Sequence, residues 1–482
     1  MKYILSGHVY WNDVQTLIQV FFPNLHYYET DTPQAEGLTV ESRWNGTCAE
    51  AVLYENGVEK SSASFPGEEN SEKEAKRCIK GALYHLLSKE TGFYPQWGIL
   101  TGVRPAKLAN GLLKDGMTEE AAFQYLTEKY LVSPQKAKLM LQVGKEEQRI
   151  LDSCGKDEVS LYIGIPFCPT RCLYCSFTAY PFSRYAKRVD AYLDALTKEL
   201  TAIRHLMGGK RMRSIYIGGG TPTTLNEEQL KRLLHHVAQT FPLERDMEYT
   251  VEAGRPDTIT REKLEIIKAY GADRISINPQ TMNDHTLALV GRKHTAAQVE
   301  EIFHLAREAG HNNINMDLIL GLPEEKPADV KRTMERIAAL QPDNLTVHTL
   351  AVKRASRLKE ELENFVLTQA GVIEEMLAIA AEGAGNMGMH PYYMYRQKNM
   401  VGNFENVGYC LPGKEGIYNV QIMEEKQTIF AAGAGGTTKM VEPATDRIER
   451  AFNVKSVEDY IARIDEMIAR KEALAEKLGG RI

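Results

Sequence analysis

Long apolar runs and a strong excess of charge are both missing from this sequence of 482 residues. No stretch reaches the roughly 18 uninterrupted apolar residues of a membrane-spanning helix, and the opening residues turn polar too early for a signal peptide. The formal net charge of −6 creates no general attraction toward nucleic acid or an anionic membrane. We therefore expect a cytoplasmic protein with no membrane span and no nucleic-acid partner.

Cysteine is also scarce. The chain has seven cysteines, an odd number, and four of them are scattered: Cys48, Cys78, Cys154 and Cys410. This distribution argues against a disulfide framework and fits a reducing compartment. The other three, Cys168, Cys172 and Cys175, lie within eight residues in the stretch IPFCPTRCLYC. This group calls for a separate explanation.

The composition is that of an ordinary globular protein, with 43% apolar and 25% charged residues. The length exceeds what one hydrophobic core usually serves, so several domains are expected. Changes in pattern along the chain predict four parts: a small α+β domain over 1–95, a helical connector over 96–150, an α/β domain over 151–383, and a C-terminal extension over 384–482.

Periodicity predicts the elements of the first two parts. Strands are expected over 2–7, 37–44 and 48–55, and helices over 11–22, 71–90, 118–131 and 133–151. From residue 159 the pattern becomes a regular alternation of strand and helix. The strands are predicted at 159–165, 213–219, 248–253, 274–278, 313–320 and 344–350.

These strands are short and apolar enough to be buried on both faces, and helix-length segments join them, which implies a parallel sheet. Six such units predict an α/β fold, an open or partial (β/α)6 barrel. In the extension we expect strands over 416–423 and 427–435 and a final helix over 456–478.

Unusual residues follow these strands where each one ends. Ligands bind at the carboxyl ends of parallel strands, because the following loops and helix N-termini converge there. The residues expected at this edge are the three clustered cysteines, the GGGTPT turn at 218–223, Glu252, Gln280, Asp317 and His348.

The three cysteines favour an iron–sulfur cluster. A structural zinc site usually has four ligands in paired CxxC-type steps, and no second pair is present. Buried structural thiols are the other alternative, but three beside Arg171 and two prolines suit core packing poorly. The CxxxCxxC spacing fits three corners of a 4Fe–4S cubane and leaves one iron open to a ligand that is not protein.

An open iron beside a glycine-rich strand end suggests S-adenosyl-L-methionine (SAM) as that ligand. Its reductive cleavage would yield a 5′-deoxyadenosyl radical, so the cofactor would carry the hard chemistry. Glycines allow close backbone approach. Glu252 and Asp317 are placed to accept hydrogen bonds from ammonium or ribose groups, and Arg292 to pair with a carboxylate.

In these motifs the sequence resembles the radical SAM enzymes, and among them the oxygen-independent coproporphyrinogen III oxidase group. The segments LYIGIPFC, GGGTPT, ADRISINPQ, GRKHT and NMDLILGLP occur in that group's order. The tract YRQKNMVGNFENVGY and the additional N-terminal domain are similar to its HemZ-type branch.

The resemblance implies roles for individual residues. It makes Cys168, Cys172 and Cys175 the cluster ligands. It also implies a set of contacts to SAM: Tyr162, Gly219, Gly220, Thr221, Glu252, Gln280, Arg292 and Asp317. Two departures concern the substrate. The characterised oxidases continue with x-Cys, where this chain has Ser176 and Phe177. Phenylalanine at this point is shared with the related haem-chaperone branch. Both the oxidases and the chaperones have a histidine at the position of Gly164.

The resemblance further implies a tetrapyrrole substrate and a small electron donor such as flavodoxin or ferredoxin. The adenosyl radical would take a hydrogen from a propionate β-carbon, carbon dioxide would leave, and a vinyl group would remain after loss of one electron. Two rounds convert coproporphyrinogen III to protoporphyrinogen IX. Cations near the carboxylates are expected to include Arg396 and Lys398, with Lys353, Arg354 and Arg357 as further candidates.

Two alternatives stay open at this point. A haem-binding chaperone would keep the cluster without decarboxylation, and its candidate iron ligands are His348, His390, Met387, Met389 and Cys410. A haem-modifying enzyme would use the radical on haem itself, for methyl transfer or ring opening.

Overall fold

The computed structural model describes most of the chain as two compact units. The described residues are 1–23, 25–34, 36–69, 71–177, 179–244, 246–351, 356–360, 369–397, 404–442 and 445–478. The first unit comprises Met1–Lys145 with Met394–Glu405, and the second comprises Glu146–Tyr393 with Asn406–Ile482. The division into two compact units does not test the domain boundaries expected at 95, 150 and 383, which remain predictions.

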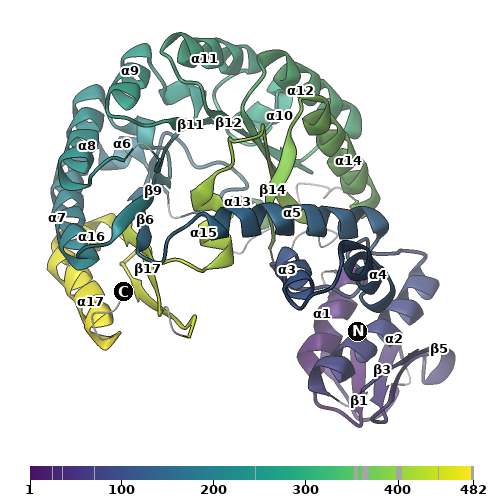
Figure 1. Ribbon diagram of the computed structural model, residues 1–482. Helices are drawn as coiled ribbons and strands as arrows, with labels where there is room; N and C mark the ends of the chain where they lie inside the picture. Colours follow the sequence, from purple (N-terminus) through teal and green to yellow (C-terminus); the bar gives the residue numbers. More distant parts are fainter. Residues whose placement is uncertain are drawn as a thin grey trace. The chain divides into compact units, whose positions relative to one another are not determined.

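The first unit contains a sheet with the strand order β2-β1-β3-β4-β5 among its described residues. The strands are β1 (Lys2–Ser6), β2 (Tyr28–Glu29), β3 (Leu38–Trp44), β4 (Cys48–Glu55) and β5 (Val58–Pro66). Helix α2 (Glu72–Thr91) packs on β3, β4 and β5, and helix α1 (Trp11–Phe21) packs against α2 (Figure 1). The predicted strands and helices of this part are confirmed, but β5 escaped prediction. Its sequence VEKSSASFP is mostly exposed, so it has no apolar face to reveal it.

Three helices follow in the first unit: α3 (Ala106–Lys114), α4 (Glu119–Lys129) and α5 (Pro134–Asp152), the last of which continues into the second unit. The sequence predicted α4 and α5 correctly. Thr118 caps α4, because its side-chain oxygen accepts a hydrogen bond from the Ala121 amide.

The second unit is built on parallel strands. Within the described residues its sheet has the order β14-β15-β13-β12-β11-β10-β9-β6-β16-β17-β18. The six predicted strands are found as β6 (Glu158–Ile165), β9 (Arg211–Gly219), β10 (Glu248–Gly254), β11 (Arg274–Ile277), β12 (Ile314–Leu320) and β13 (Asn344–Thr349). Each pairs in parallel with the next, which confirms the predicted parallel sheet.

Helices connect these strands and lie along their outer side in an arc (Figure 1). They are α7 (Val189–Met207), α8 (Glu227–Thr240), α9 (Arg261–Ala269), α10 (Asp284–Leu289), α11 (Ala296–Glu308), α12 (Pro327–Leu340) and α14 (Ala370–Asn386). Several begin at a strong cap. Asn226 with Gln229, and Thr295 with Gln298, form reciprocal capping boxes.

The parallel strands carry apolar residues on one face and polar residues on the other. Successive side chains of a strand point to opposite faces. In β6, Leu161 and Ile163 are fully buried on one face, while Ser160 and Tyr162 lie on the other. Ser160 accepts a hydrogen bond from Ser214 of β9, so the polar faces adjoin. The strands are buried on both faces, as expected, although one of these faces carries polar side chains.

The C-terminal part adds strands at both edges of the sheet. β14 (His390–Arg396) and β15 (Glu405–Cys410) follow β13, and β16 (Ile429–Ala432), β17 (Thr437–Val441) and β18 (Ile448–Phe452) follow β6. The predicted strand over 416–423 was wrong, because this segment is helix α15 (Ile417–Glu424). The predicted final helix is divided into α16 (Val457–Ala462) and α17 (Ile464–Lys477).

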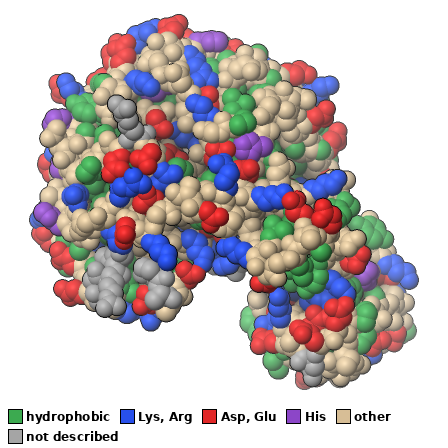
Figure 2. All heavy atoms as spheres, viewed as in Figure 1, with side chains coloured by type: hydrophobic (Ala, Val, Ile, Leu, Met, Phe, Trp, Pro, Cys, Tyr) green, Lys and Arg blue, Asp and Glu red, His purple; other side chains and the backbone are tan. Residues whose placement is uncertain are grey.

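Acidic and basic side chains alternate over the face of the molecule in Figure 2. No helix in the part of the chain that the structure describes has both the length and the apolar character needed to cross a membrane.

A buried ion pair joins α17 to α7. The Lys471 ammonium donates to the Glu199 carboxylate at 2.5 Å, and the two side chains are 1% and 0% exposed. Glu199 also accepts hydrogen bonds from the Gly433 amide, the Asn453 side chain and the Tyr460 hydroxyl. The network therefore connects Gly433, before β17, and Asn453, after β18, to α7, the helix that follows the cysteine loop.

Replacing Lys471 tests this network. Lys471→Met leaves the Glu199 carboxylate buried without its cation, and we expect the free energy of unfolding to fall by about 3–5 kcal/mol. Lys477→Met on the same helix removes an exposed lysine and should change it by less than about 0.5 kcal/mol. Denaturant unfolding measures both variants, and an equal loss of unfolding free energy in the two would contradict the importance of the buried pair.

Candidate functional site

The three clustered cysteines lie in a loop at the carboxyl end of β6. Cys168 ends the short strand β7 (Phe167–Cys168), Cys172 is 7% exposed, and none of the three forms a disulfide. The loop is fixed by backbone bonds: the Leu173 amide donates to the Val290 carbonyl, and the Leu358 amide donates to the Leu173 carbonyl. Leu173 also packs in an apolar cluster with Val290 and Leu358.

The thiols lie close enough to influence one another. Burial raises the pKa of Cys168 to about 11, a hydrogen bond from Thr221 lowers it, and charge on Cys175 and Cys172 raises it further. Three thiolates so close together repel one another unless positive charge lies between them. The donor set therefore fits a cationic iron–sulfur cluster held by three cysteines.

The glycine turn after β9 packs directly on this loop. The Gly220 amide donates to the Ile165 carbonyl and the Thr221 amide to the Phe167 carbonyl, both at 2.8 Å. A Cβ at Gly220 would lie 2.6 Å from the Phe167 oxygen, which no side chain tolerates. Thr221 is buried and its hydroxyl lies 3.5 Å from the Cys168 sulfur. The predicted GGGT residues and the cysteines are thus brought together.

Glu252 lies on β10, the strand that pairs with β9, and its carboxylate lies next to Gly218. A Cβ at Gly218 would lie 2.9 Å from a Glu252 carboxylate oxygen, so glycine leaves the space that the carboxylate occupies. Tyr216 donates a short hydrogen bond to Glu252. Burial raises the pKa of Glu252 to about 7, although the hydrogen bond from Tyr216 opposes this shift.

Three tyrosine rings stack beside this carboxylate. The ring centroids of Tyr216 and Tyr418 of α15 lie 4.5 Å apart, and each lies 6.3 Å from the ring of Tyr162 of β6. The sequence analysis singled out Tyr162 only. Tyr418 belongs to the segment that was predicted to be a strand, so its place beside the polar face was not foreseen.

Asp317 of β12 lies on the same polar face. Its carboxylate accepts from the Asn315 side chain at 2.7 Å and lies 3.9 Å from the His348 ring. Burial alone would raise the pKa of Asp317, but hydrogen bonds and charge from His348 and the bond from Asn315 outweigh it and lower the pKa. This carboxylate is therefore held in its ionised form.

Gln280 and Arg292 lie beyond the ends of β11 and α10. Gln280 has a φ of +70°, an uncommon conformation for a residue with a side chain, and its backbone pairs with Asp317 and Ile319. Arg292 is buried and donates to the Asn278 carbonyl and to the Tyr174 hydroxyl. Its guanidinium therefore braces the cysteine loop against the end of β11.

Arg255 is a site residue that the sequence analysis missed. It donates to the Thr170 hydroxyl at 2.8 Å and lies 4.0 Å from the Cys172 sulfur. Asp257 holds its guanidinium through two bonds of 2.9 Å. Burial opposes ionisation of Asp257, but hydrogen bonds from His294 and Arg255 lower its pKa overall. A basic residue directly after a strand end was the available signal.

The expected substrate cations are placed differently. Arg396 is 3% exposed, donates to the Leu100 carbonyl, and lies over the Trp97 ring within the first unit. Lys398, Lys353 and Arg354 lie outside the described residues. Arg357 begins the short helix α13 (Arg357–Glu360) and is exposed.

The candidate haem ligands are not brought together as one set. His348 lies beside Asp317, whereas His390 and Cys410 lie 3.8 Å apart on the neighbouring strands β14 and β15. Met389 is buried next to His390, and Met387 follows the end of α14.

Taken together, one edge of the parallel sheet combines three thiols, a glycine turn, a carboxylate with a raised pKa, and an ionised carboxylate. Such an edge has ligands for an iron–sulfur cluster, backbone groups for close contact with a polar ligand, and acceptors for its ammonium or hydroxyl groups.

Comparison with known proteins agrees with this chemistry. Residues 162–337 match the model of the radical SAM superfamily, whose members typically use a 4Fe–4S cluster and SAM. The oxygen-independent coproporphyrinogen-III oxidase-like protein HemZ of Bacillus subtilis is 40% identical over 455 residues, which cover 92% of this chain and 89% of that protein.

Two further matches are more distant. The haem chaperone HemW of Bacillus subtilis is 32% identical over 321 residues, covering 64% of this chain and 76% of that protein. The solved structure of coproporphyrinogen III oxidase (HemN) from Escherichia coli aligns with a TM-score of 0.52 at 24% identity, over 66% of this chain and 72% of that one. The last match shows a shared fold.

The matched region contains the cysteine loop, the glycine turn, Glu252 and Asp317, and the likeness to HemZ covers 92% of the chain and so extends well beyond this region. The chain therefore belongs to the radical SAM superfamily, in its HemZ-type branch of oxygen-independent coproporphyrinogen-III oxidase-like proteins.

Proposed function

We propose that this protein is a radical SAM oxidoreductase of tetrapyrrole metabolism that converts coproporphyrinogen III to protoporphyrinogen IX without oxygen. The observation that carries the proposal is the meeting of three thiols, a glycine turn and Glu252 at one strand edge, in a chain of the HemZ-type branch. The parallel sheet would form the partial (β/α)6 barrel expected from the sequence.

The site residues have separate tasks in this proposal. Cys168, Cys172 and Cys175 hold the 4Fe–4S cluster, and Arg255 keeps their loop in place through Thr170. When bound, the cluster and SAM supply the reducing electron and the radical that abstracts hydrogen. The protein contributes position, charge and exclusion of water.

SAM contacts would come from the residues around the glycine turn. Backbone groups at close range would come from Gly219, Gly220 and Thr221. Tyr162 lies next to this turn, since a Cβ at Gly219 would be 3.1 Å from the Tyr162 hydroxyl. The acceptors for ammonium and hydroxyl groups are Glu252 and Asp317, and Gln280 and Arg292 complete the set at the ends of β11 and α10.

On the substrate, each round removes one hydrogen atom from the β-carbon of a propionate group. The bond to the carboxylate carbon then breaks, carbon dioxide leaves, and one electron passes to an external one-electron acceptor. The product is a vinyl group, and two propionates react. A small protein such as flavodoxin or ferredoxin would deliver the reducing electron.

A second candidate function is haem transfer without decarboxylation. Phe177 stands where the oxidases resembled by this chain have a further cysteine, and the chain is 32% identical to a haem chaperone over 321 residues. The product of the reaction distinguishes the two candidates.

Anaerobic turnover tests the proposed reaction. The reconstituted protein, supplied with reductant, SAM and coproporphyrinogen III, should form vinyl products detectable by mass spectrometry. Cys172→Ala should form none, because the cluster loses a ligand, and Cys154→Ser should match the wild type. A protein that cleaves SAM and binds haem tightly but leaves coproporphyrinogen III unchanged would contradict the proposal and support the chaperone.

The raised pKa of Glu252 predicts a pH dependence of SAM binding. Above about pH 7 the carboxylate is ionised and attracts the positively charged SAM, and below it the protonated group does not. From about pH 8 to about pH 6 we expect the dissociation constant to rise about tenfold. Calorimetry should show a much flatter profile for Glu252→Gln; the same slope in both proteins would exclude Glu252 as the titrating group.

A further inference from the structure

A second group of metal-binding side chains lies in the second unit, formed by His390, Cys410 and Glu415. His390 begins β14, Cys410 ends β15, and Glu415 lies in the loop before α15. The His390 Nε2 atom lies 3.8 Å from the Cys410 sulfur and 3.3 Å from a Glu415 carboxylate oxygen. The three ligand atoms all lie within 4.8 Å of one another.

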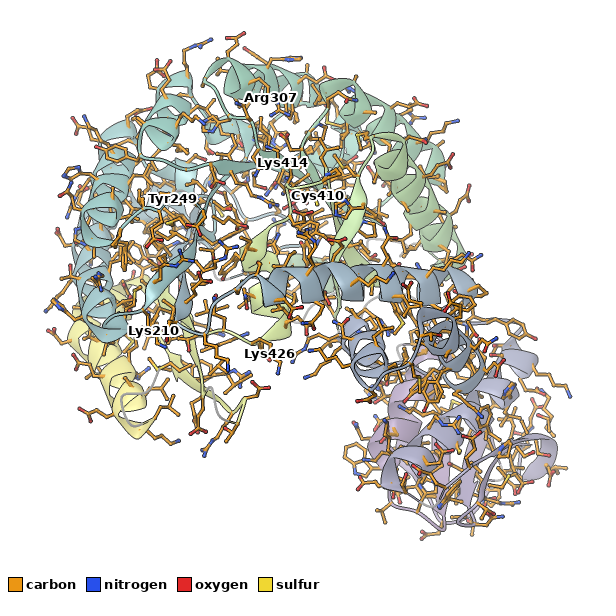
Figure 3. The ribbon with its side chains drawn as sticks, viewed as in Figure 1. Lys210, Tyr249, Arg307, Cys410, Lys414 and Lys426 are labelled. Atoms are coloured by element: carbon orange, nitrogen blue, oxygen red, sulfur yellow. The ribbon has the colours of Figure 1, made fainter. Side chains whose placement is uncertain are left out.

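This group is separate from the cysteine loop. Cys410 pairs with Asn344, the first residue of β13, whereas the SAM-binding residues follow the carboxyl ends of the strands. Asn344 and His348 are four residues apart, or roughly 13 Å along the strand. Leu411, directly after Cys410, donates to Asp343, and Lys414 donates to Asn312. Arg307 also donates to the Asp343 carboxylate, next to the start of β13, and Figure 3 labels Arg307, Lys414 and Cys410.

Two of the three distances are close to those between ligands of one tetrahedral ion, and the third, from the Cys410 sulfur to the Glu415 carboxylate, is at most 4.8 Å. With zinc bond lengths of about 2.3 Å to sulfur and about 2.0–2.1 Å to nitrogen or oxygen, the sulfur and nitrogen lie about 3.5 Å apart, and nitrogen and oxygen about 3.4 Å apart. The measured separations of 3.8 and 3.3 Å differ from these values by a few tenths of an ångström.

The same geometry disfavours haem as the ligand. A histidine and a thiolate on opposite faces of one iron would lie about 4.3 Å apart with similar bond lengths, and a porphyrin plane would have to pass between them. His390 and Cys410 are closer than this, and Cys410 is fully buried.

Charges of both signs surround this group, with the carboxylates nearest to His390 and with Arg274 and Arg149 acting on Cys410. Glu146 of α5 lies 3.9 Å from the His390 ring, which adds a second carboxylate. Arg149 pairs with both Glu146 and Glu415 at present, but its side chain is 58% exposed. An exposed pair of this kind is weak, so its guanidinium can turn into solvent at little cost when an ion takes its place.

Access and burial are also suitable. The side chains of His390 and Glu415 are 22% and 10% exposed, so an ion can reach them from solvent. The Cys410 thiol is buried and its pKa is raised by that burial and by Glu415. Metal binding would therefore displace a proton from a thiol that is otherwise neutral.

We propose that His390, Cys410 and Glu415 form a site for a divalent transition metal of the zinc type, with Glu146 or a water molecule as the fourth ligand. The ion would fasten the start of β14 and the end of β15 to the loop before α15. Mixed nitrogen, sulfur and carboxylate ligands select zinc or cobalt over magnesium and calcium. The site is independent of the cysteine loop and of the proposed reaction.

Cobalt is the probe for this site. A full-length variant with Cys168, Cys172 and Cys175 replaced by alanine removes the cluster and its absorbance. Titrated anaerobically with Co²⁺ after chelation, it should bind a single equivalent and show both a thiolate-to-cobalt charge-transfer band and the visible bands of tetrahedral cobalt. Adding Cys410→Ser should abolish the charge-transfer band, and adding His390→Ala should weaken binding more than about 100-fold.

Controls use the same background and the unaltered protein. Cys154→Ser, a cysteine near the end of α5, should leave the cobalt bands unchanged. In the cluster-containing chain, zinc should raise the melting temperature of the wild type and not of Cys410→Ser. Absence of the charge-transfer band, or its persistence in Cys410→Ser, would overturn the proposal. Neither result depends on SAM cleavage, so failure here is distinguishable from failure of the proposed function.

Discussion

Two backbone hydrogen bonds hold the glycine turn against the cysteine loop, from Gly220 to Ile165 and from Thr221 to Phe167. This approach leaves no room for a side chain at Gly220. It also brings Thr221 to Cys168 and aligns the end of β9 with the end of β6. Because parallel strands in register end at the same level, Glu252 and Asp317 reach the same edge, and the candidate site is a consequence of that register.

This arrangement places carboxylates on the polar face of the parallel strands, where they are buried. Buried carboxylates lose hydration and need partners. Glu252 has Tyr216, Asp317 has His348 and Asn315, and Glu248 accepts from the Ile417 amide. Burial nevertheless raises the pKa of Glu248 and Glu252, which shows that pairing offsets the lost hydration only in part. A face that served packing alone would carry apolar residues here, as the opposite face does.

Most of the second unit could be predicted because its strands and helices have different periods and the cysteine spacing is distinctive. Several features of the chain could not be predicted. β5 is exposed and polar, so no pattern marks it. The segment of α15 is apolar and short, and the structure places Tyr418 against Tyr216 as part of a helix. Arg255 acts on Thr170, which is 85 residues away, and only the fold brings these together. The roles assigned to the SAM contacts remain predictions.

The pairing of β16 with β6 affects the order in which the molecule can assemble. Phe430 lies opposite Leu161, so the strand that leads into the cysteines borrows one neighbour from a segment made some 270 residues later. During synthesis that edge of β6 stays unpaired until the late segment emerges, and an unpaired strand edge favours pairing errors. A chain interrupted before residue 429 would therefore lack the strand that pairs with β6, and β6 is the strand that leads into the cysteine loop.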